Sequence, residues 1–310
     1  MPNKPNKYGI KIFALCDSKT FYTSNLEVYV GTQPDGPFAQ NTSTLSLVDR
    51  LCEPIHGSGR NITTDNWFTS IPLAEKLIQR NLTTIGTIRK NKKEIPPEFV
   101  QGKNRPIGSS MFGFRKDCTL VSYVPKKKKN VLLISTCHSD DKIDGNSSKP
   151  DIIIDYNRTK GGVDVVDKLC ASYNTARATR RWQMVIFYSL LNLSGINSQV
   201  IFCANKPQSR VVRRQFLENL ALCLIEPHLK IRAMSQNLPR PLRVRICHIC
   251  KLEVAEANRN TENIFGRCFN CSSKKNRRTK YRCQDCNKFL CLEHVTIFCM
   301  ECSSQEEAKD

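Results

Sequence analysis

Residues 60–70 read Arg60-Asn61-Ile62-Thr63-Thr64-Asp65-Asn66-Trp67-Phe68-Thr69-Ser70. The β-rich run that ends at Thr64 is typical of a short strand. The amphipathic spacing that starts at Ser70 predicts a helix to Gln79, with Ser70 as its N-cap. Asp65 therefore follows a strand and precedes a helix. Carboxylates that hold metal ions in α/β proteins often lie at such strand ends, so this segment gives both a fold class and a first candidate site.

Strands and helices are predicted on both sides of this segment. Upstream, alternating and apolar runs predict two strands at residues 8–16 and 21–29 and a helix at 45–52. Downstream, further strands are predicted at residues 83–89, 111–114, 119–124, 130–136 and 152–156. Helices are predicted at residues 162–173, 182–203 and 213–228. Strands followed by helices, with helices interleaved, favour an α/β or α+β fold.

A second acidic motif lies at the start of the predicted helix 162–173 and reads Lys160-Gly161-Gly162-Val163-Asp164-Val165-Val166-Asp167. Asp164 and Asp167 are three residues apart, so on a helix they share one face. Together with Asp65 they could supply the hard oxygen ligands that Mg²⁺ prefers, as in metal-assisted phosphoryl transfer. In the alternative interpretation Asp65 caps a helix and Asp167 is a surface charge. Spacing alone favours this alternative.

The composition favours a polyanionic partner. The chain has 310 residues, with 48 Lys and Arg against 28 Asp and Glu, which gives a formal net charge of +20. Nucleic acid is the simplest partner for such a charge. A basic protein with no such partner would have the same composition, so charge alone does not separate the two.

The cysteines favour metal ligation over disulfides. Residues 1–7 do not resemble a secretory leader, and we expect no membrane span because polar residues interrupt the apolar stretch 182–203, which predicts a buried helix. Nine of the 16 cysteines fall between Cys247 and Cys302, mostly as Cys-x-x-Cys pairs.

Four ligand pairs predict a zinc module near the C-terminus. They are Cys268 and Cys271, Cys283 and Cys286, Cys291 and His294, and Cys299 and Cys302. Thiolates and imidazole at this spacing bind tetrahedral Zn²⁺, so eight ligands predict two ions, whose binding would drive folding of the segment. We therefore expect a large domain over residues 1–236, a linker at 237–244, the zinc-binding domain at 245–302 and a disordered tail at 303–310.

Two features of this module have more than one interpretation. Cys247 and Cys250 form an additional pair, which either joins an alternative ligand set with Cys268 and Cys271 or lies free on the surface. A basic segment between the pairs contributes Lys274, Lys275, Arg277 and Arg278. These residues are interpreted as phosphate contacts, a nuclear-localisation sequence or a solvated loop.

Two further basic clusters lie in the large domain. Residues 126–129 are four consecutive lysines, and a solvated hairpin turn is preferred over a DNA contact for them. Arg177, Arg180 and Arg181 precede the long apolar helix and are candidates for a DNA channel near Asp164, because Arg and helix N-termini suit phosphate.

Several motifs closely resemble the piggyBac transposase family. The resemblance rests on residues 2–11, on residues 54–70 with their Asn-Trp-Phe-Thr-Ser-Ile-Pro-Leu continuation, on residues 156–164, on Arg181-Trp182 and on the C-terminal cysteines. It covers nearly the whole chain. It implies an α/β fold with an RNase H-like core, a helical segment and a cross-braced zinc module that binds the DNA ends of the element.

The resemblance also implies chemistry and residue roles. It implies nuclear cut-and-paste transposition of double-stranded DNA into TTAA targets, with Asp65 and Asp164 as the second and third catalytic carboxylates and Asp167 supporting them. In the cross-brace it implies, one zinc ion is held by Cys268, Cys271, Cys291 and His294. The second is held by Cys283, Cys286, Cys299 and Cys302.

One position of the family pattern has no counterpart in these residues. The first catalytic Asp of the family lies on a strand upstream of residues 8–11, so we expect a core without its first strand, and an N-terminally truncated chain. Asp17 matches a Cys-Asp-Ser turn that is not catalytic in the family. Because two carboxylates cannot easily hold two Mg²⁺ ions in line with DNA, we expect little strand cleavage by this chain alone. The alternatives are a carboxylate borrowed from a second copy or a full-length transposase, and a domesticated, non-catalytic zinc-dependent DNA- or chromatin-binding factor.

Overall fold

The computed structural model describes residues 9–101, 104–209, 211–235, 237–253, 265–284 and 286–296. The chain divides into two compact units, Met1–Ala221 and Leu222–Asp310. The boundary falls within a helix, upstream of the domain boundary predicted after residue 236.

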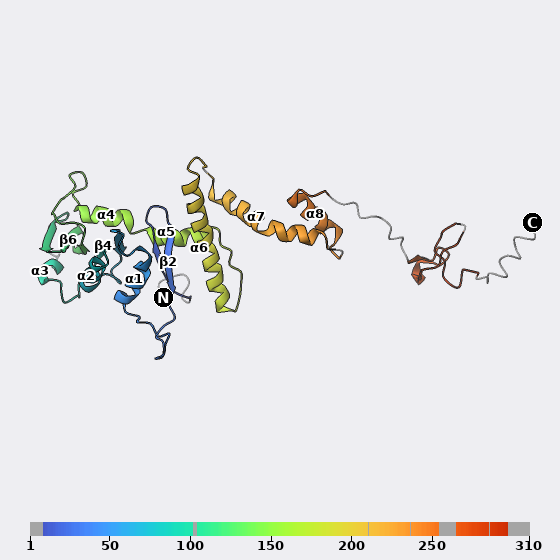
Figure 1. Ribbon diagram of the computed structural model, residues 1–310, viewed down its shortest axis with the longest axis horizontal. Coiled ribbons are helices and arrows are strands. Elements are labelled where there is room, and N and C mark those ends of the chain that lie inside the picture. Colours follow the sequence, from blue (N-terminus) through green and yellow to red (C-terminus); the bar gives the residue numbers. More distant parts are fainter. Residues whose placement is uncertain are drawn as a thin grey trace, which may run out of the picture. The chain divides into compact units, whose positions relative to one another are not determined.

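The first unit has both strands and helices (Figure 1). Its elements, in chain order, are β1 Ile12–Cys16, β2 Thr23–Val28, α1 Thr44–Cys52, η1 Glu53–Ile55, β3 Asn61–Thr64, α2 Ile71–Gln79, β4 Thr83–Thr87, α3 Pro97–Val100, β5 Ser110–Arg115, β6 Cys118–Lys126, β7 Lys129–Ser135, α4 Asp151–Thr159, α5 Gly162–Ser172 and α6 Trp182–Asn205. Helix α7 Arg213–Ala233 runs from the first unit into the second.

A five-stranded mixed sheet forms the larger part of the first unit. Its strand order is β3-β4-β7-β6-β5, and only the β3–β4 pair is parallel. Strands β6 and β7 form a hairpin in which Lys126 pairs with Lys129, and Lys128 has a positive φ of 63°. The predicted hairpin turn at residues 126–129 is confirmed, and all four lysines are exposed.

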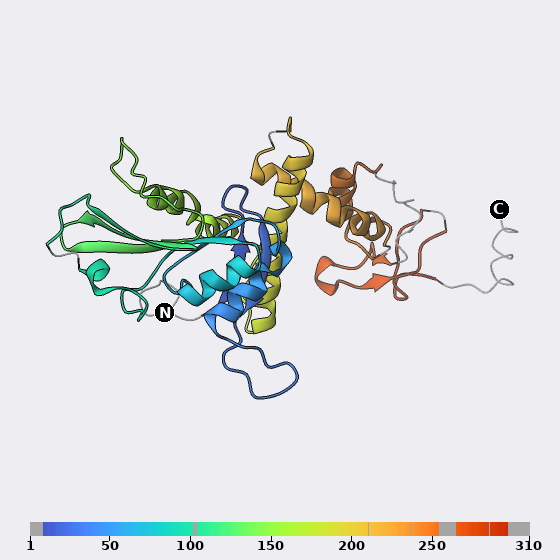
Figure 2. The same ribbon diagram turned by 60° about the vertical axis from the view of Figure 1, so that its left-hand side comes forward.

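Helices cover both faces of this sheet, and the period of two along its strands decides which side chain meets which helix. Leu133 faces one side, where Ile152 and Ile153 of α4 pack on it. Leu132 and Ile134 face the other side, where they pack with Ala74 of α2. Figure 1 and Figure 2 show α4 on one side of the sheet and α2 and α3 on the other.

A separate two-stranded sheet of β1 and β2 packs on α1. Phe13 of β1 is buried against Leu47 and Leu51 of α1. Between α1 and β2, Arg50 donates two hydrogen bonds to Glu27, of 2.9 Å and 2.8 Å. Bidentate pairing of this kind fixes the orientation of α1 on β2.

The strand predicted at residues 152–156 is wrong, because these residues lie in helix α4. A short apolar run does not separate a strand from a buried helix by itself. Ile152, Ile153 and Tyr156 pack on the sheet together, and this spacing is that of one helix face. Pro150 and Asp151 at the start of α4 are residues that favour a helix N-terminus.

Helix α6 has the predicted position but is not the buried helix that was expected. Of its described side chains only Asn192 and Ile196 are buried, while Trp182, Phe187 and Ile201 are at least half exposed. The helix is apolar on all sides and therefore cannot bury its whole surface against one neighbour. By length and composition alone α6 could cross a membrane, a test that core helices of soluble proteins also pass.

The linker predicted at residues 237–244 is also wrong for its second half, because α8 spans Arg240–Cys250 in the second unit. The segment contains Pro239 and Pro241, but proline is compatible with the start and the first turn of a helix. Helix α8 buries Ile246, Cys247 and Cys250. Cys247 and Cys250 are thus not the free surface pair considered above. The second unit also contains β8 Gly266–Arg267, η2 Ser273–Lys275 and β9 Arg278–Thr279.

Candidate functional site

Asp65 lies in the exposed turn that joins β3 to α2. One carboxylate oxygen, Oδ1, accepts hydrogen bonds from the backbone N–H groups of Trp67 (2.9 Å) and Phe68 (3.3 Å). The other, Oδ2, makes no hydrogen bond to any residue that the structure describes. Asp65 does not cap α2, whose N-cap is Ser70 as predicted, with its hydroxyl accepting from Leu73 N. One oxygen thus orients the carboxylate and the other is available for a ligand.

A buried pair of hydroxyls holds this turn in place. The Oγ1 atoms of Thr64 and Thr69 lie 2.7 Å apart, and Thr69 Oγ1 donates to the carbonyl of Asp65 at 2.7 Å. Gly86 of the neighbouring strand β4 packs directly on both hydroxyls, where a Cβ would lie 2.4 Å and 2.5 Å from them. We call Thr64, Thr69 and Gly86 the threonine clasp. Sequence analysis missed it, because Gly86 is brought to Thr64 by the parallel pairing of β3 with β4.

Trp67 connects the same turn to β1. Its ring stacks on Phe13 at a centroid distance of 5.6 Å and an interplanar angle of 9°. Lys11 Nζ lies 4.4 Å from both ring centroids, a distance typical of a cation–π contact. Trp67 therefore supports the wall of the candidate site.

The second acidic motif lies on α5, with Asp164 in its first turn. Asp164 and Asp167 are both exposed. Helix α5 packs on β1, where Gly162 approaches the carbonyl of Cys16. Burial raises the pKa of the Cys16 thiol, a hydrogen bond with Thr23 partly offsets this, and the charge of Asp167 raises it further. Asp167 therefore lies close enough to β1 to affect its electrostatics.

A cleft of about 820 Å³ separates β1 from β3 and reaches α5. We call it the β1–β3 cleft. Its lining includes Ala14 to Cys16 of β1, Asn61 to Thr63 of β3, and Gly162 and Val163 of α5. On the wall of the cleft, the Oγ1 atoms of Thr63 and Thr159 are hydrogen-bonded at 2.7 Å. This bond joins β3 to the last residue of α4, just before the start of α5.

Both strands that border the cleft have one unpaired edge in the described part of the chain. Strand β1 pairs only with β2, and β3 pairs only with β4. The carbonyl of Lys11 accepts from Tyr29 N on the β2 side, so in an antiparallel ladder the peptide groups of Ile12 and Ala14 point away from β2. The cleft is thus bordered by backbone donors and acceptors on two sides.

The candidate carboxylates do not form a complete metal site by themselves. Within the described ranges, neither Asp65 nor Asp164 belongs to a group of three or more His, Cys, Asp or Glu side chains whose ligand atoms lie within 4.8 Å of one another. Asp17 also borders the cleft, but its carboxylate accepts from the backbone N–H groups of Lys19 and Thr20 and from the Thr20 hydroxyl. These hydrogen bonds, of which that from the Thr20 hydroxyl has the largest effect, lower the pKa of Asp17. The carboxylate therefore stabilises its own turn.

The arginines predicted to contact DNA lie in an exposed loop before α6. Arg177, Arg180 and Arg181 are all exposed. The loop is anchored by the buried Asn192 of α6, whose Oδ1 accepts from Thr175 N (3.0 Å) and Thr175 Oγ1 (2.9 Å). In the sequence Asn192 only interrupts an apolar stretch, yet in the structure it anchors the start of the loop that carries the three arginines.

Asn197 has a similar structural role one helical turn and a half further along α6. Its side chain donates to the Thr23 carbonyl and accepts from Thr23 N, both at 2.9 Å. The amide thus pairs with the backbone of β2 as a neighbouring strand would. The two asparagines explain why polar residues occur within this apolar helix.

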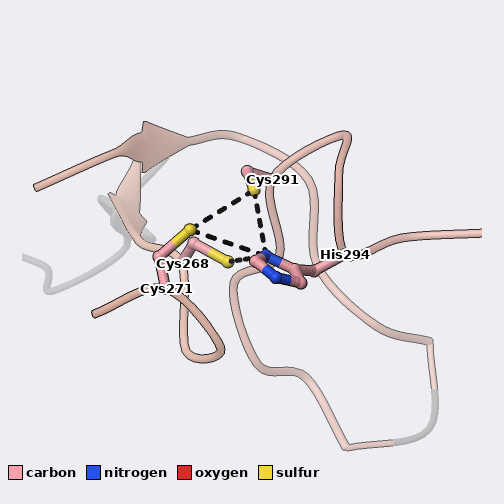
Figure 3. Close-up of side chains that lie close together, drawn as sticks. All are labelled: Cys268, Cys271, Cys291 and His294. Atoms are coloured by element: carbon pink, nitrogen blue, oxygen red, sulfur yellow. Dashed lines mark hydrogen bonds between the residues drawn. The ribbon is translucent and has the colours of Figure 1, made fainter. Parts of the chain in front are cut away.

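Four ligands of the predicted zinc module lie together in the second unit: Cys268, Cys271, Cys291 and His294 (Figure 3). The Cys271 and Cys291 sulfurs are 3.7 Å apart, and the three sulfurs lie 3.3–3.5 Å from His294 Nδ1. Zn–S and Zn–N bonds of about 2.3 Å and 2.1 Å give tetrahedral edges of about 3.8 Å and 3.6 Å. The donor set and its spacing therefore fit a tetrahedral metal ion.

Hydrogen bonding among these ligands shifts their protonation. Burial raises the pKa of Cys268, but hydrogen bonds from the backbone of Cys291 and Asn270 and from His294 outweigh it and lower the pKa to about 6. Hydrogen bonds with Cys291 and Cys268 raise the pKa of His294. A metal ion at this site would compete with protons for the same atoms.

The second predicted ligand set is only partly described. Cys283 and Cys286 lie in the loop after β9, whereas Cys299 and Cys302 lie outside the described residues, as does the tail 303–310. The basic residues Lys274, Lys275, Arg277 and Arg278 are all exposed, with the two lysines in η2 and Arg278 in β9. Arg277 forms an ion pair with Glu293, next to the metal ligand His294.

Comparison with known proteins places these features in a family. A family model described as transposase IS4 matches residues 1–199. The chain is also similar to the cryo-EM structure of a piggyBac transposase synaptic complex with hairpin DNA, with 39% sequence identity and a TM-score of 0.76. The match covers 97% of this chain and 65% of that one, so this chain spans about two thirds of the length of its relative.

Proposed function

Since this chain belongs to the piggyBac transposase family, we propose that it is a transposase-derived DNA-binding protein related to cut-and-paste transposition at TTAA targets. The observation that carries the proposal is the oriented carboxylate of Asp65, which follows β3 in a turn held by the threonine clasp. A carboxylate with one oxygen fixed and one available is suited to metal-assisted phosphoryl transfer. Its place of action would be the nucleus.

The catalytic carboxylates of this proposal are Asp65 and Asp164, with Asp167 assisting. All three are exposed oxygen donors, and such ligands fit Mg²⁺. Bound Mg²⁺ would neutralise charge that develops on the phosphate during transfer. The residues of this chain would orient the ions, and Trp67 would keep the Asp65 turn against β1.

We expect these residues to cleave DNA poorly unless a further carboxylate reaches them. The support for this is the β1–β3 cleft, whose two borders are unpaired strand edges among the described residues. A strand from a second copy or from a full-length transposase would find hydrogen-bonding partners on both sides there. It could carry an acidic side chain to the face on which α5 lies.

DNA would be bound mainly through phosphate contacts. Support comes from the net charge of +20 and from exposed cations in both units. The candidates are Arg177, Arg180 and Arg181 in the first unit and Lys274, Lys275, Arg277 and Arg278 in the second. Phosphate contacts of this kind give affinity that falls steeply with salt.

A second candidate function is a non-catalytic, zinc-dependent DNA- or chromatin-binding factor. It is favoured by one contrast: the four ligands around His294 lie together, whereas the carboxylates form no such cluster in the described residues. In both proposals Zn²⁺ is the ion for the Cys268 cluster, since three sulfurs and one nitrogen suit it better than an all-oxygen metal. A second Zn²⁺ would need Cys283, Cys286, Cys299 and Cys302.

A single set of assays separates these functions. The full chain, prepared with Zn²⁺, is tested on TTAA-flanked element ends with Mg²⁺ or Mn²⁺, for binding by mobility shift and for strand cleavage by gel. The proposal expects salt-dependent binding with little cleavage, and cleavage restored by adding a full-length transposase whose own Asp at the position of Asp65 is mutated. Robust cleavage by this chain alone that is lost in Asp65→Ala would contradict the expected incompleteness. Absence of any DNA binding would contradict both functions.

A further inference from the structure

A cysteine, a histidine and an aspartate form a hydrogen-bonded series at the end of β7. Cys137 Sγ lies 3.4 Å from His138 Nδ1, and His138 Nε2 lies 3.2 Å from Asp155 Oδ2 on α4. The buried hydroxyl of Ser135 lies 2.8 Å from the same Nδ1 and 3.3 Å from the Cys137 sulfur. None of these residues belongs to the carboxylate site or to the metal cluster described above.

The partners of the imidazole decide its tautomer. A carboxylate can only accept hydrogen bonds, so Nε2 carries the proton that Asp155 accepts. Nδ1 then has one lone pair, which can accept from the Ser135 hydroxyl at 2.8 Å or from the Cys137 thiol at 3.4 Å. The thiol can also donate to Asn61 Oδ1 at 3.6 Å, so its proton has two acceptors within reach. The other carboxylate oxygen of Asp155, Oδ1, lies 3.3 Å from Arg158, so this ion pair does not compete with the hydrogen bond from His138 to Oδ2. A nucleophile beside a base that a third group orients is the arrangement that activates nucleophiles in enzymes.

The Cys137 thiol is accessible from a cavity. Cys137 is exposed, while the His138 side chain is only 13% exposed. Cys137 and His138 line a cavity of about 610 Å³ together with Asn81, Lys116 and Asp117. This volume is in the range of small-molecule sites. Lys116 and Asp117 offer one charge of each sign, which suits a zwitterionic peptide.

The other cysteines of the first unit differ from Cys137 in environment. Burial raises the pKa of Cys118, which lines the same cavity, and raises that of Cys52 to about 12. Cys223, on α7 in the second unit, is exposed as Cys137 is, but no histidine of the described residues forms a hydrogen bond with it. Only Cys137, among the cysteines described in the first unit, combines exposure with an adjacent oriented imidazole.

We propose that Cys137 is a reactive nucleophilic thiol that undergoes thiol–disulfide exchange with a small zwitterionic peptide disulfide such as oxidised glutathione. Cys137 gives its proton to His138 Nδ1, directly or through the Ser135 hydroxyl. The thiolate attacks one sulfur of the disulfide, so that a new S–S bond forms to Cys137 as the original S–S bond breaks. The departing sulfur takes the proton from His138 and leaves as a thiol. The protein thiol is oxidised and the peptide disulfide supplies the oxidising equivalent.

This site does not depend on the proposed DNA chemistry. Ser135 ends β7, Cys137 and His138 follow it, and Asp155 lies on α4, whereas the candidate carboxylates lie after β3 and on α5. Loss of DNA cleavage or DNA binding in a variant would therefore neither support nor contradict the reactive thiol.

The test measures the rate of mixed-disulfide formation at each cysteine. The full chain, with Zn²⁺ bound, is incubated with oxidised glutathione, quenched at intervals and analysed by peptide mass mapping at Cys137 and at the exposed reference Cys223. We expect Cys137 to react at least about tenfold faster than Cys223, and His138→Gln to remove most of that difference, because a positioned general base contributes on the order of 10²-fold or more. Asp155→Asn, which keeps the ring in place, should give an intermediate rate.

Matched controls keep this test decisive. His56→Gln, in which the lost imidazole pairs with Asp49 instead, should leave the Cys137 rate unchanged. Circular dichroism reports whether His138→Gln is folded, and if it is not, Asp155→Asn provides the deciding comparison. Equal rates at Cys137 and Cys223 would overturn the proposal, as would an unchanged Cys137 rate in both folded variants.

Discussion

Gly86→Ala tests whether the threonine clasp holds the Asp65 turn. The added Cβ would lie 2.4 Å from Thr69 Oγ1, 2.5 Å from Thr64 Oγ1 and 2.8 Å from the Thr64 carbonyl. Ordinary contacts between carbon and oxygen are near 3.4 Å, so a threonine hydroxyl must move by about 1 Å. The two hydroxyls bond to each other, and that of Thr69 also donates to Asp65 O, so neither can move without loss of a buried hydrogen bond.

The expected loss of stability follows from three contributions. Overpacking of a buried site costs about 1–3 kcal/mol, and a lost buried hydrogen bond adds about 0.5–1.5 kcal/mol. Alanine also lowers the conformational entropy of the unfolded chain, which offsets about 0.4–1 kcal/mol of this loss. The net expected decrease in the free energy of unfolding is about 2 kcal/mol, which lowers the urea midpoint by roughly 1 M for a slope near 2 kcal/mol per M.

The assay uses Trp67 as a local probe. The chain has two tryptophans, and Trp182 is 61% exposed, so Trp182→Phe leaves the fluorescence of Trp67 to report on the first unit. Gly145→Ala is the matched control, since a Cβ there meets nothing within 4 Å, and its free energy of unfolding should stay within about 0.5 kcal/mol of that of the parent. If Gly86→Ala unfolds at the same urea concentration as Gly145→Ala, the clasp has no stabilising role.

Three further predictions concern the loop, the metal cluster and an acidic turn. Asn192→Leu should speed tryptic cleavage within residues 174–181 several-fold, because the loop loses three hydrogen bonds to that amide; an unchanged digestion rate would mean that the anchor is dispensable. Cys291→Ser should lower the zinc content measured by elemental analysis by one ion per chain, whereas full retention would contradict Cys291 as a required ligand. Asp17→Asn should remove a pH-dependent part of stability. The pKa of Asp17 is lowered on folding, so its contribution is present above about pH 4 and lost as pH falls through the lower folded pKa. Identical acid-unfolding curves for wild type and Asp17→Asn would contradict this.

Patterns of period two and 3.6 predicted most of the elements, but not where apolar runs were short. The strands ending at Cys16 and Thr64 and the helix that starts after Ser70 are confirmed within a few residues. Residues 152–156 were predicted as a strand because their three consecutive isoleucines fit either a buried strand or a buried helix. Only the packing of Tyr156 on the same face as Ile152 and Ile153 separates the two. Pro239 and Pro241 concealed α8 for a related reason, since proline breaks a helix interior but is compatible with its first turn.

Ligand spacing could be read from the sequence where the ligands are local, and not where they are distant. Cys268 and Cys271 are close neighbours in the chain, and the cluster they form with Cys291 and His294 is confirmed as a set of residues that lie together. The threonine clasp needs the register of β3 with β4, which no local pattern contains. The contact between His138 and Asp155 requires Asp155 to lie on a helix, so the predicted strand at 152–156 hid it.

The β1–β3 cleft connects the fold to the proposed chemistry. A strand in the cleft would face α1 and Phe68 on one side, where Phe13 and Leu15 already pack. Its alternate side chains would face α5, on the side where Asp167 acts on Cys16. In the proposed site, the acidic residue of an added strand would therefore lie on that second face, toward α5, which carries Asp164 in its first turn. The same unpaired edges invite association when the cleft is empty. Acidic substitutions on the two faces of an added strand should therefore differ in effect, with only the face toward α5 able to restore cleavage.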